Sequence, residues 1–130
     1  MRSPILLSFF LILALMACQP KTNSKVQFVL LPSPTTFNIS GESKLKAADL
    51  ESSFQSAKNH FTTGKLLSEF QDEIFAFTLD SVLQLPAEGY SLSITAQKIE
   101  IKASTNAGLW YGLMTLGQLL QDAKDQNAFL

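Results

Sequence analysis

Hydrophobic residues near the C-terminus recur with helical spacing. In the stretch NAGLWYGLMTLGQLLQ, residues 106–121, leucines follow one another at steps of four, three and four residues: Leu109, Leu113, Leu116 and Leu120. This spacing places one apolar stripe along a helix of 3.6 residues per turn. Ser104, Thr105 and Asn106 stand at its start, where each could accept a hydrogen bond from a free backbone N–H group. The pattern therefore predicts a capped helix.

The same stretch contains three glycines and no charge. Gly108, Gly112 and Gly117 lie in or at the edge of the predicted helix, where each costs roughly 1 kcal/mol relative to alanine. Close approach of another backbone or of an aromatic ring would offset this cost, because glycine has no Cβ. No charged residue occurs from Ala103 to Gln121, but the polar residues and glycines would make a poor membrane span. We therefore expect a buried core helix.

Apolar spacing predicts a second helix earlier in the chain. Between Lys46 and Phe61, apolar residues recur at helical intervals with polar residues between them, and Gly64 follows as a stop signal. Before this helix, alternating apolar residues at 26–30 predict a strand. A Pro-Ser-Pro break follows, and the segment through Phe37 and Ile39 predicts a second short strand.

Three further strands are predicted between the two helices. EIFAFTLD, residues 73–80, has apolar residues on both faces, which predicts a central strand. Residues 89–104 alternate in two arms and predict a β-hairpin that turns at Ala96 to Lys98. The order strand, strand, helix, strand, strand, strand, helix predicts an α+β fold: a small mixed β-sheet with two helices packed on one face.

The N-terminus has the features of an export signal. Arg2 precedes an apolar run from Ile5 to Ala17, which is typical of a signal peptide over residues 1–17 and is too short to span a bilayer. The ending LMAC resembles the bacterial lipobox, so we expect lipid attachment at Cys18 and a lipid-anchored protein in the periplasm or outer membrane. An ordinary cleaved signal is the alternative. Residues 18–25 are then a polar tether, and residues 26–130 form one domain.

The composition narrows the possible chemistry. The 130-residue chain has one cysteine, which excludes an internal disulfide, and no arginine after Arg2, which excludes an arginine clamp for anions. The lysines are scattered, so we expect no nucleic-acid partner. No dinucleotide or phosphate-loop motif occurs, so we expect no cofactor, and His60 is the only histidine, without a second ligand for a metal. Catalysis would have to depend on carboxylates.

Few residues are candidates for chemistry. Asp72 and Glu73 are the only adjacent acids, and glycoside hydrolysis uses carboxylate pairs. They stand before an apolar strand without Gly or His around them, which favours a solvated strand entrance. Tyr90, Trp110 and Tyr111 could stack on a sugar ring, although core packing is the more common role of such residues.

Two stretches resemble a known family. LLPSPTTFNISGE, residues 30–42, and EGYSLSITAQKIEIKASTNAGLWYGLMTLGQLL, residues 88–120, resemble the small N-terminal domain of family 20 glycoside hydrolases, the β-N-acetylhexosaminidases. The resemblance covers essentially the whole chain after Cys18. Two features depart from it: Met114 stands where a glutamine is common, and the hairpin turn lacks the usual Asp or Gly.

The resemblance implies a small α/β domain that packs against a following (β/α)₈ barrel. The barrel of such enzymes carries the active site, where an Asp-Glu pair works with the acetamido group of the substrate. It implies no catalytic residue in this chain and a domain-packing role for four residues of the glycine-rich helix: Gly108, Trp110, Tyr111 and Gly112.

The implied parent enzyme removes terminal N-acetylhexosamine from glycans or chitin oligomers. This chain would be its N-terminal accessory domain or a fragment, with the glycan bound through the barrel, and we expect the reading frame to continue beyond Leu130 into that barrel. Two alternatives remain open. One is another glycosidase family, such as the O-GlcNAcase and hyaluronidase group or the α-glucuronidases, and the other is a free-standing lipoprotein that binds a glycan or a protein.

Overall fold

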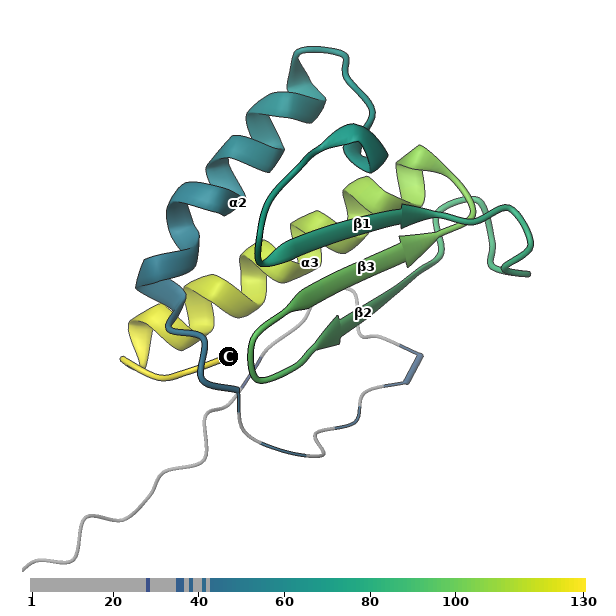
Figure 1. Ribbon diagram of the computed structural model, residues 1–130. Coiled ribbons are helices and arrows are strands. Elements are labelled where there is room, and N and C mark those ends of the chain that lie inside the picture. Colours follow the sequence, from purple (N-terminus) through teal and green to yellow (C-terminus); the bar gives the residue numbers. More distant parts are fainter. Residues whose placement is uncertain (1–27, 29–34, 37, 39–40, 42) are drawn as a thin grey trace, which may run out of the picture.

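A three-stranded mixed sheet carries two helices on one face in the computed structural model (Figure 1). The structure describes residues 28, 35–36, 38, 41 and 43–130. The two strands expected over 26–30 and through Phe37 and Ile39 therefore fall largely outside the described residues. Phe28, which belongs to the first of them, is partly buried and packs against the core.

The strands are β1 (Phe75–Leu79), β2 (Tyr90–Ile94) and β3 (Ile99–Ala103), in the order β1-β3-β2. β3 runs parallel to β1 and antiparallel to β2. The β2–β3 hairpin turns over residues 95–98, where the Thr95 N–H donates to the Lys98 carbonyl oxygen at 2.8 Å. This confirms the predicted hairpin.

The prediction that residues 73–80 form the central strand is wrong for the described sheet. β3 holds the central position, and β1 pairs with it along one side only, within the part of the chain that the structure describes. The side chains explain the difference: Phe75 and Phe77 are buried on one face, whereas Thr78 and Leu79 are exposed at the end of the strand. A run of apolar residues here reflects one buried face and an exposed end rather than burial on both faces.

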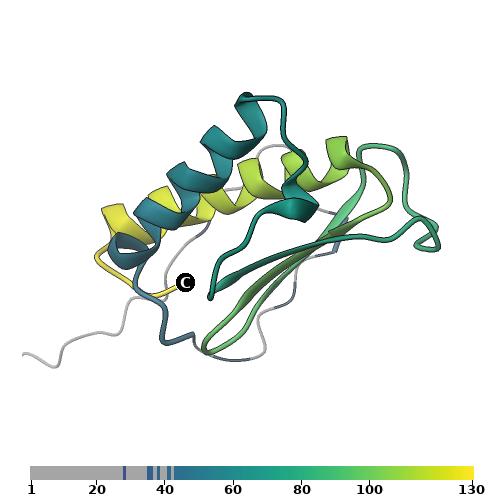
Figure 2. The same cartoon turned by 45° about the horizontal axis from the view of Figure 1, so that its top comes forward.

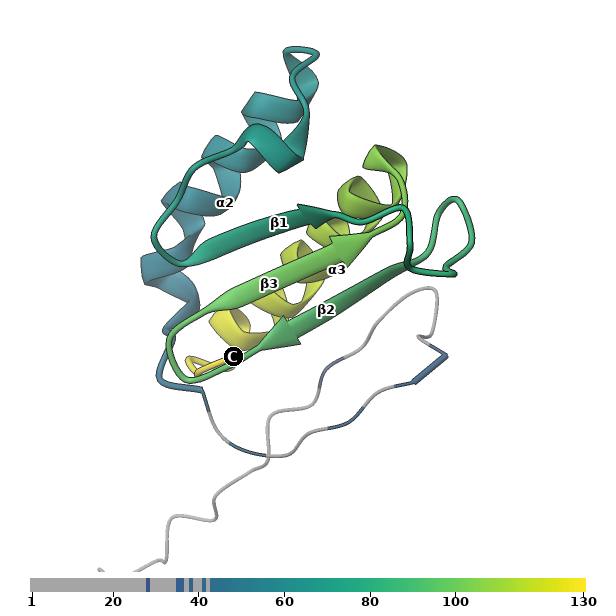
Figure 3. The same ribbon diagram turned by 45° about the vertical axis from the view of Figure 1, so that its right-hand side comes forward.

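Two helices cover one face of the sheet. α2 spans Ala47–Thr62, α3 spans Asn106–Asp125, and the short 3₁₀-helix η2 spans Leu67–Glu69. α3 lies directly on the strands, and α2 lies beside α3 on the same side of the sheet (Figures 1, 2 and 3). This arrangement confirms the predicted α+β fold with a small mixed sheet and two helices on one face.

The leucine stripe of α3 forms the centre of the core. All four of its leucines are buried, and they pack in one cluster with Phe75, Ile99 and Ile101 of the sheet. Burying a leucine side chain contributes about 1.5–3 kcal/mol, so the stripe holds the helix to the sheet. The predicted core helix is confirmed. No helix among the described residues combines the length and the hydrophobicity needed to cross a bilayer.

Polar residues at the start of α3 hold it to the preceding loop. Thr105 is the N-cap: its hydroxyl accepts from the Gly108 N–H at 3.0 Å and donates to the Ala87 carbonyl oxygen. Ser104 donates to the Leu83 carbonyl oxygen instead of capping, and the Asn106 amide oxygen accepts from the Leu67 N–H at 3.3 Å. Only one of the three predicted capping residues therefore caps the helix. Ser104 instead connects loop 80–89 to the start of the helix, and Asn106 connects η2 to it.

Candidate functional site

Gly108 and Gly112 of α3 lie against the domain's own strands and loop 80–89. A Cβ on Gly112 would lie 2.5 Å from the Ile101 Cγ2 atom, which is closer than real Cβ contacts allow, and 3.2 Å from the Tyr90 ring, which is tight. A Cβ on Gly108 would overlap the Gly89 carbonyl oxygen and approach the Ala103 Cβ atom to 2.8 Å. Both glycines are buried. Both are close-packing positions within the domain itself, and their predicted contact with a following domain stays a prediction.

Gly117 serves the contact between the two helices. A Cβ there would lie 2.7 Å from the Phe54 Cζ atom of α2. Phe54 is buried, so its ring occupies the space that the glycine leaves. Close approach of an aromatic ring therefore accounts for this glycine, and close approach of a backbone accounts for Gly108.

The aromatic residues proposed as sugar contacts do not form one platform. Trp110 is partly buried and stacks on Phe61, with ring centroids 4.4 Å apart and an interplanar angle of 15°. Tyr90 packs against Gly112 and shares a hydrogen bond between its hydroxyl and that of Thr115. Tyr111 is different, because 44% of its surface is exposed. Two of the three aromatics are therefore used in packing, and Tyr111 alone is presented to the surroundings.

Asp72 anchors the start of β1. Its carboxylate accepts from the Ile74 N–H at 2.8 Å and from the Phe75 N–H at 3.0 Å. Partial burial raises the pKa of Asp72, but the hydrogen bonds from Phe75, Ile74 and the Ser53 side chain outweigh it and leave the pKa below 3.8. A general acid in glycoside hydrolysis needs a raised pKa. Asp72 is therefore a structural carboxylate that joins α2 to β1.

The sequence indicated that Asp72 and Glu73 lie at a strand entrance, and the structure confirms this position. Glu73 is exposed. The backbone hydrogen bonds of Asp72 were missed. Asp72 precedes Ile74 and Phe75 by two and three residues, which is the spacing of an Asx turn. This spacing was the signal in the sequence from which the hydrogen bonds could have been predicted.

His60 has a local structural role. Its Nε2 atom lies 3.0 Å from the Leu66 carbonyl oxygen, and its ring meets Phe70 edge-on with centroids 5.5 Å apart. Among the described residues, no group of three or more His, Cys, Asp or Glu side chains is placed to hold a metal ion. Cys18, the predicted site of lipid attachment, lies outside the described residues.

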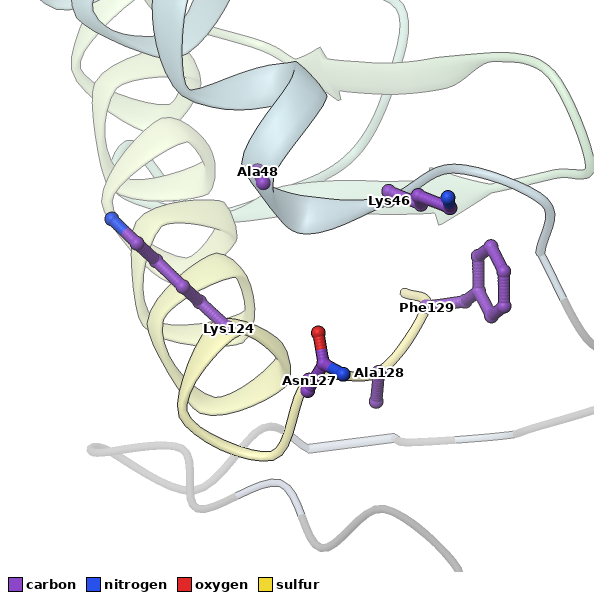
Figure 4. Close-up of a pocket in the computed structure, with 6 residues that line it drawn as sticks. All are labelled: Lys46, Ala48, Lys124, Asn127, Ala128 and Phe129. Carbon is purple, nitrogen blue, oxygen red and sulfur yellow. The ribbon is translucent and has the colours of Figure 1, made fainter.

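An open hollow of about 310 Å³ lies where the chain returns after α3 (Figure 4). Asn127 adopts a positive φ of 50°, and the Leu130 N–H donates to the Leu45 carbonyl oxygen at 3.1 Å. The lining residues are Lys46, Ala48, Lys124, Asn127, Ala128 and Phe129. The two lysine side chains extend in different directions in Figure 4, and none of the described residues that line the hollow carries a carboxylate. Its described lining therefore does not supply the acid groups that glycoside hydrolysis requires.

The comparison with known families agrees with a non-catalytic role. Residues 25–128 match the family described as "Glycosyl hydrolase family 20, domain 2", and the match covers most of the 130-residue chain. No curated protein matches the chain. Asp72, the first residue of the adjacent acid pair, has a lowered pKa, which does not suit a general acid. The chain therefore belongs to glycosyl hydrolase family 20, as the domain 2 that accompanies a catalytic domain in the parent protein.

Proposed function

We propose that the chain is the N-terminal accessory domain of an exported β-N-acetylhexosaminidase. The parent enzyme would hydrolyse terminal N-acetylhexosamine from glycans or chitin oligomers. The observation that carries this proposal is the match of residues 25–128 to domain 2 of the family. The lowered pKa of Asp72 and the exposure of Glu73 support it, because they leave this acid pair unsuited to proton transfer.

The catalytic step belongs to the companion domain in this proposal. That domain supplies the acid, the pocket and the contacts to the substrate, whereas this chain supplies a folded surface against which it packs. Trp110 and Tyr111 are the candidates for that contact. Tyr111 is the stronger one, since Trp110 is already stacked on Phe61.

The proposed location is the cell envelope. The signal peptide over residues 1–17 would direct export, Cys18 would carry the lipid, and residues 18–25 would separate the domain from the membrane. Each buried CH₂ of an acyl chain contributes about 0.8 kcal/mol, so a multiply acylated Cys18 would hold the protein stably. Cys18→Ala should move the protein from the detergent phase to the aqueous phase in a partitioning assay. Equal partitioning of the two proteins would rule out the lipid anchor.

Enzyme assays test the proposed function itself. The purified chain should release no product from an aryl N-acetyl-β-glucosaminide, whereas the parent protein that contains it should turn this substrate over. Asp72→Asn and Glu73→Gln, made in the parent, should leave turnover unchanged at temperatures where the variants are folded. Turnover by the chain alone that disappears in either variant would place catalysis in this domain and contradict the proposal.

A further inference from the structure

We draw no further inference here: the strongest candidate, the open hollow between the start of α2 and the end of α3, carries nothing because its two lysines are exposed side chains that extend in different directions and nothing in the described part of the chain shows what would fill it.

Discussion

On the side of α3 that faces the sheet, Gly108 and Gly112 are buried against the domain's own strands and loop, whereas on the outer side Ala107 and Tyr111 are exposed. Both sides come from one uncharged stretch of sequence. The inner side lacks charge because its leucines are buried in the core and because the strands and loop 80–89 approach Gly108 and Gly112 too closely for a side chain. The outer side lacks charge although solvent reaches it. Absence of charge therefore has two different causes on one helix, and only the position around the helix separates them.

Gly112→Leu should have the largest effect on stability. Leucine is the better helix former by roughly 1 kcal/mol, but its side chain would have to displace Ile101 and Tyr90. Overpacking of this kind costs about 1–3 kcal/mol, so we expect a net loss in the free energy of unfolding, measured by denaturant titration. Ala107→Leu on the outer side is the matched control and should be close to neutral. A more stable Gly112→Leu protein would show that the glycine does not pack closely.

Gly108→Ala should have the next largest effect. The new methyl group would overlap the Gly89 carbonyl oxygen, and a backbone atom cannot move aside by a side-chain rotation. We expect a loss of about 1–2 kcal/mol in thermal or chemical unfolding. Gly117→Ala meets the far end of the Phe54 ring and should lose less. Equal losses at the two positions would mean that the helix pair is as rigid as the contact between α3 and loop 80–89.

Asp72→Asn should change how stability depends on pH. The folded-state pKa of Asp72 is lowered, so its ionised form stabilises the protein above the unfolded value of about 4, and this contribution is lost as the pH falls through the lower folded-state pKa. We expect the variant to be less stable near pH 7 by under about 1 kcal/mol and to lose less stability on acidification. Parallel pH profiles for the two proteins would contradict the assigned hydrogen bonds.

Tyr111→Ser should have the smallest effect on the chain alone. An exposed side chain without a packing role changes stability by within about 0.5 kcal/mol. Trp110→Ala, one residue away, removes the stacked contact with Phe61 and should cost more. A loss for Tyr111→Ser as large as that for Trp110→Ala would place Tyr111 in the core and remove the distinction between the two sides of α3.

The sequence predicted the helices and strands better than it predicted how they pair and pack. Leucine spacing and the alternation around the hairpin are local, so α3 and β2–β3 could be placed from periodicity alone. The parallel pairing of β1 with β3 joins residues far apart in the chain, and no local pattern indicated it. The glycines pointed to close packing, but which surface they meet depends on the assembled fold. Gly112 meets the sheet of its own domain.

The candidate site was predictable only in part. Tyr111 was selected as a domain-packing residue from family resemblance, and its exposure leaves that role as a proposal.

Hydroxyl-radical footprinting of Tyr111 tests most directly whether the outer side of α3 is the contact surface for the catalytic domain. The ring should be oxidised readily in the chain alone, where 44% of the residue is exposed, and should be protected in the parent protein. Val82 in loop 80–89, which is 83% exposed, should be oxidised equally in both and serves as the internal control. Equal oxidation of Tyr111 in the chain and in the parent would contradict the account.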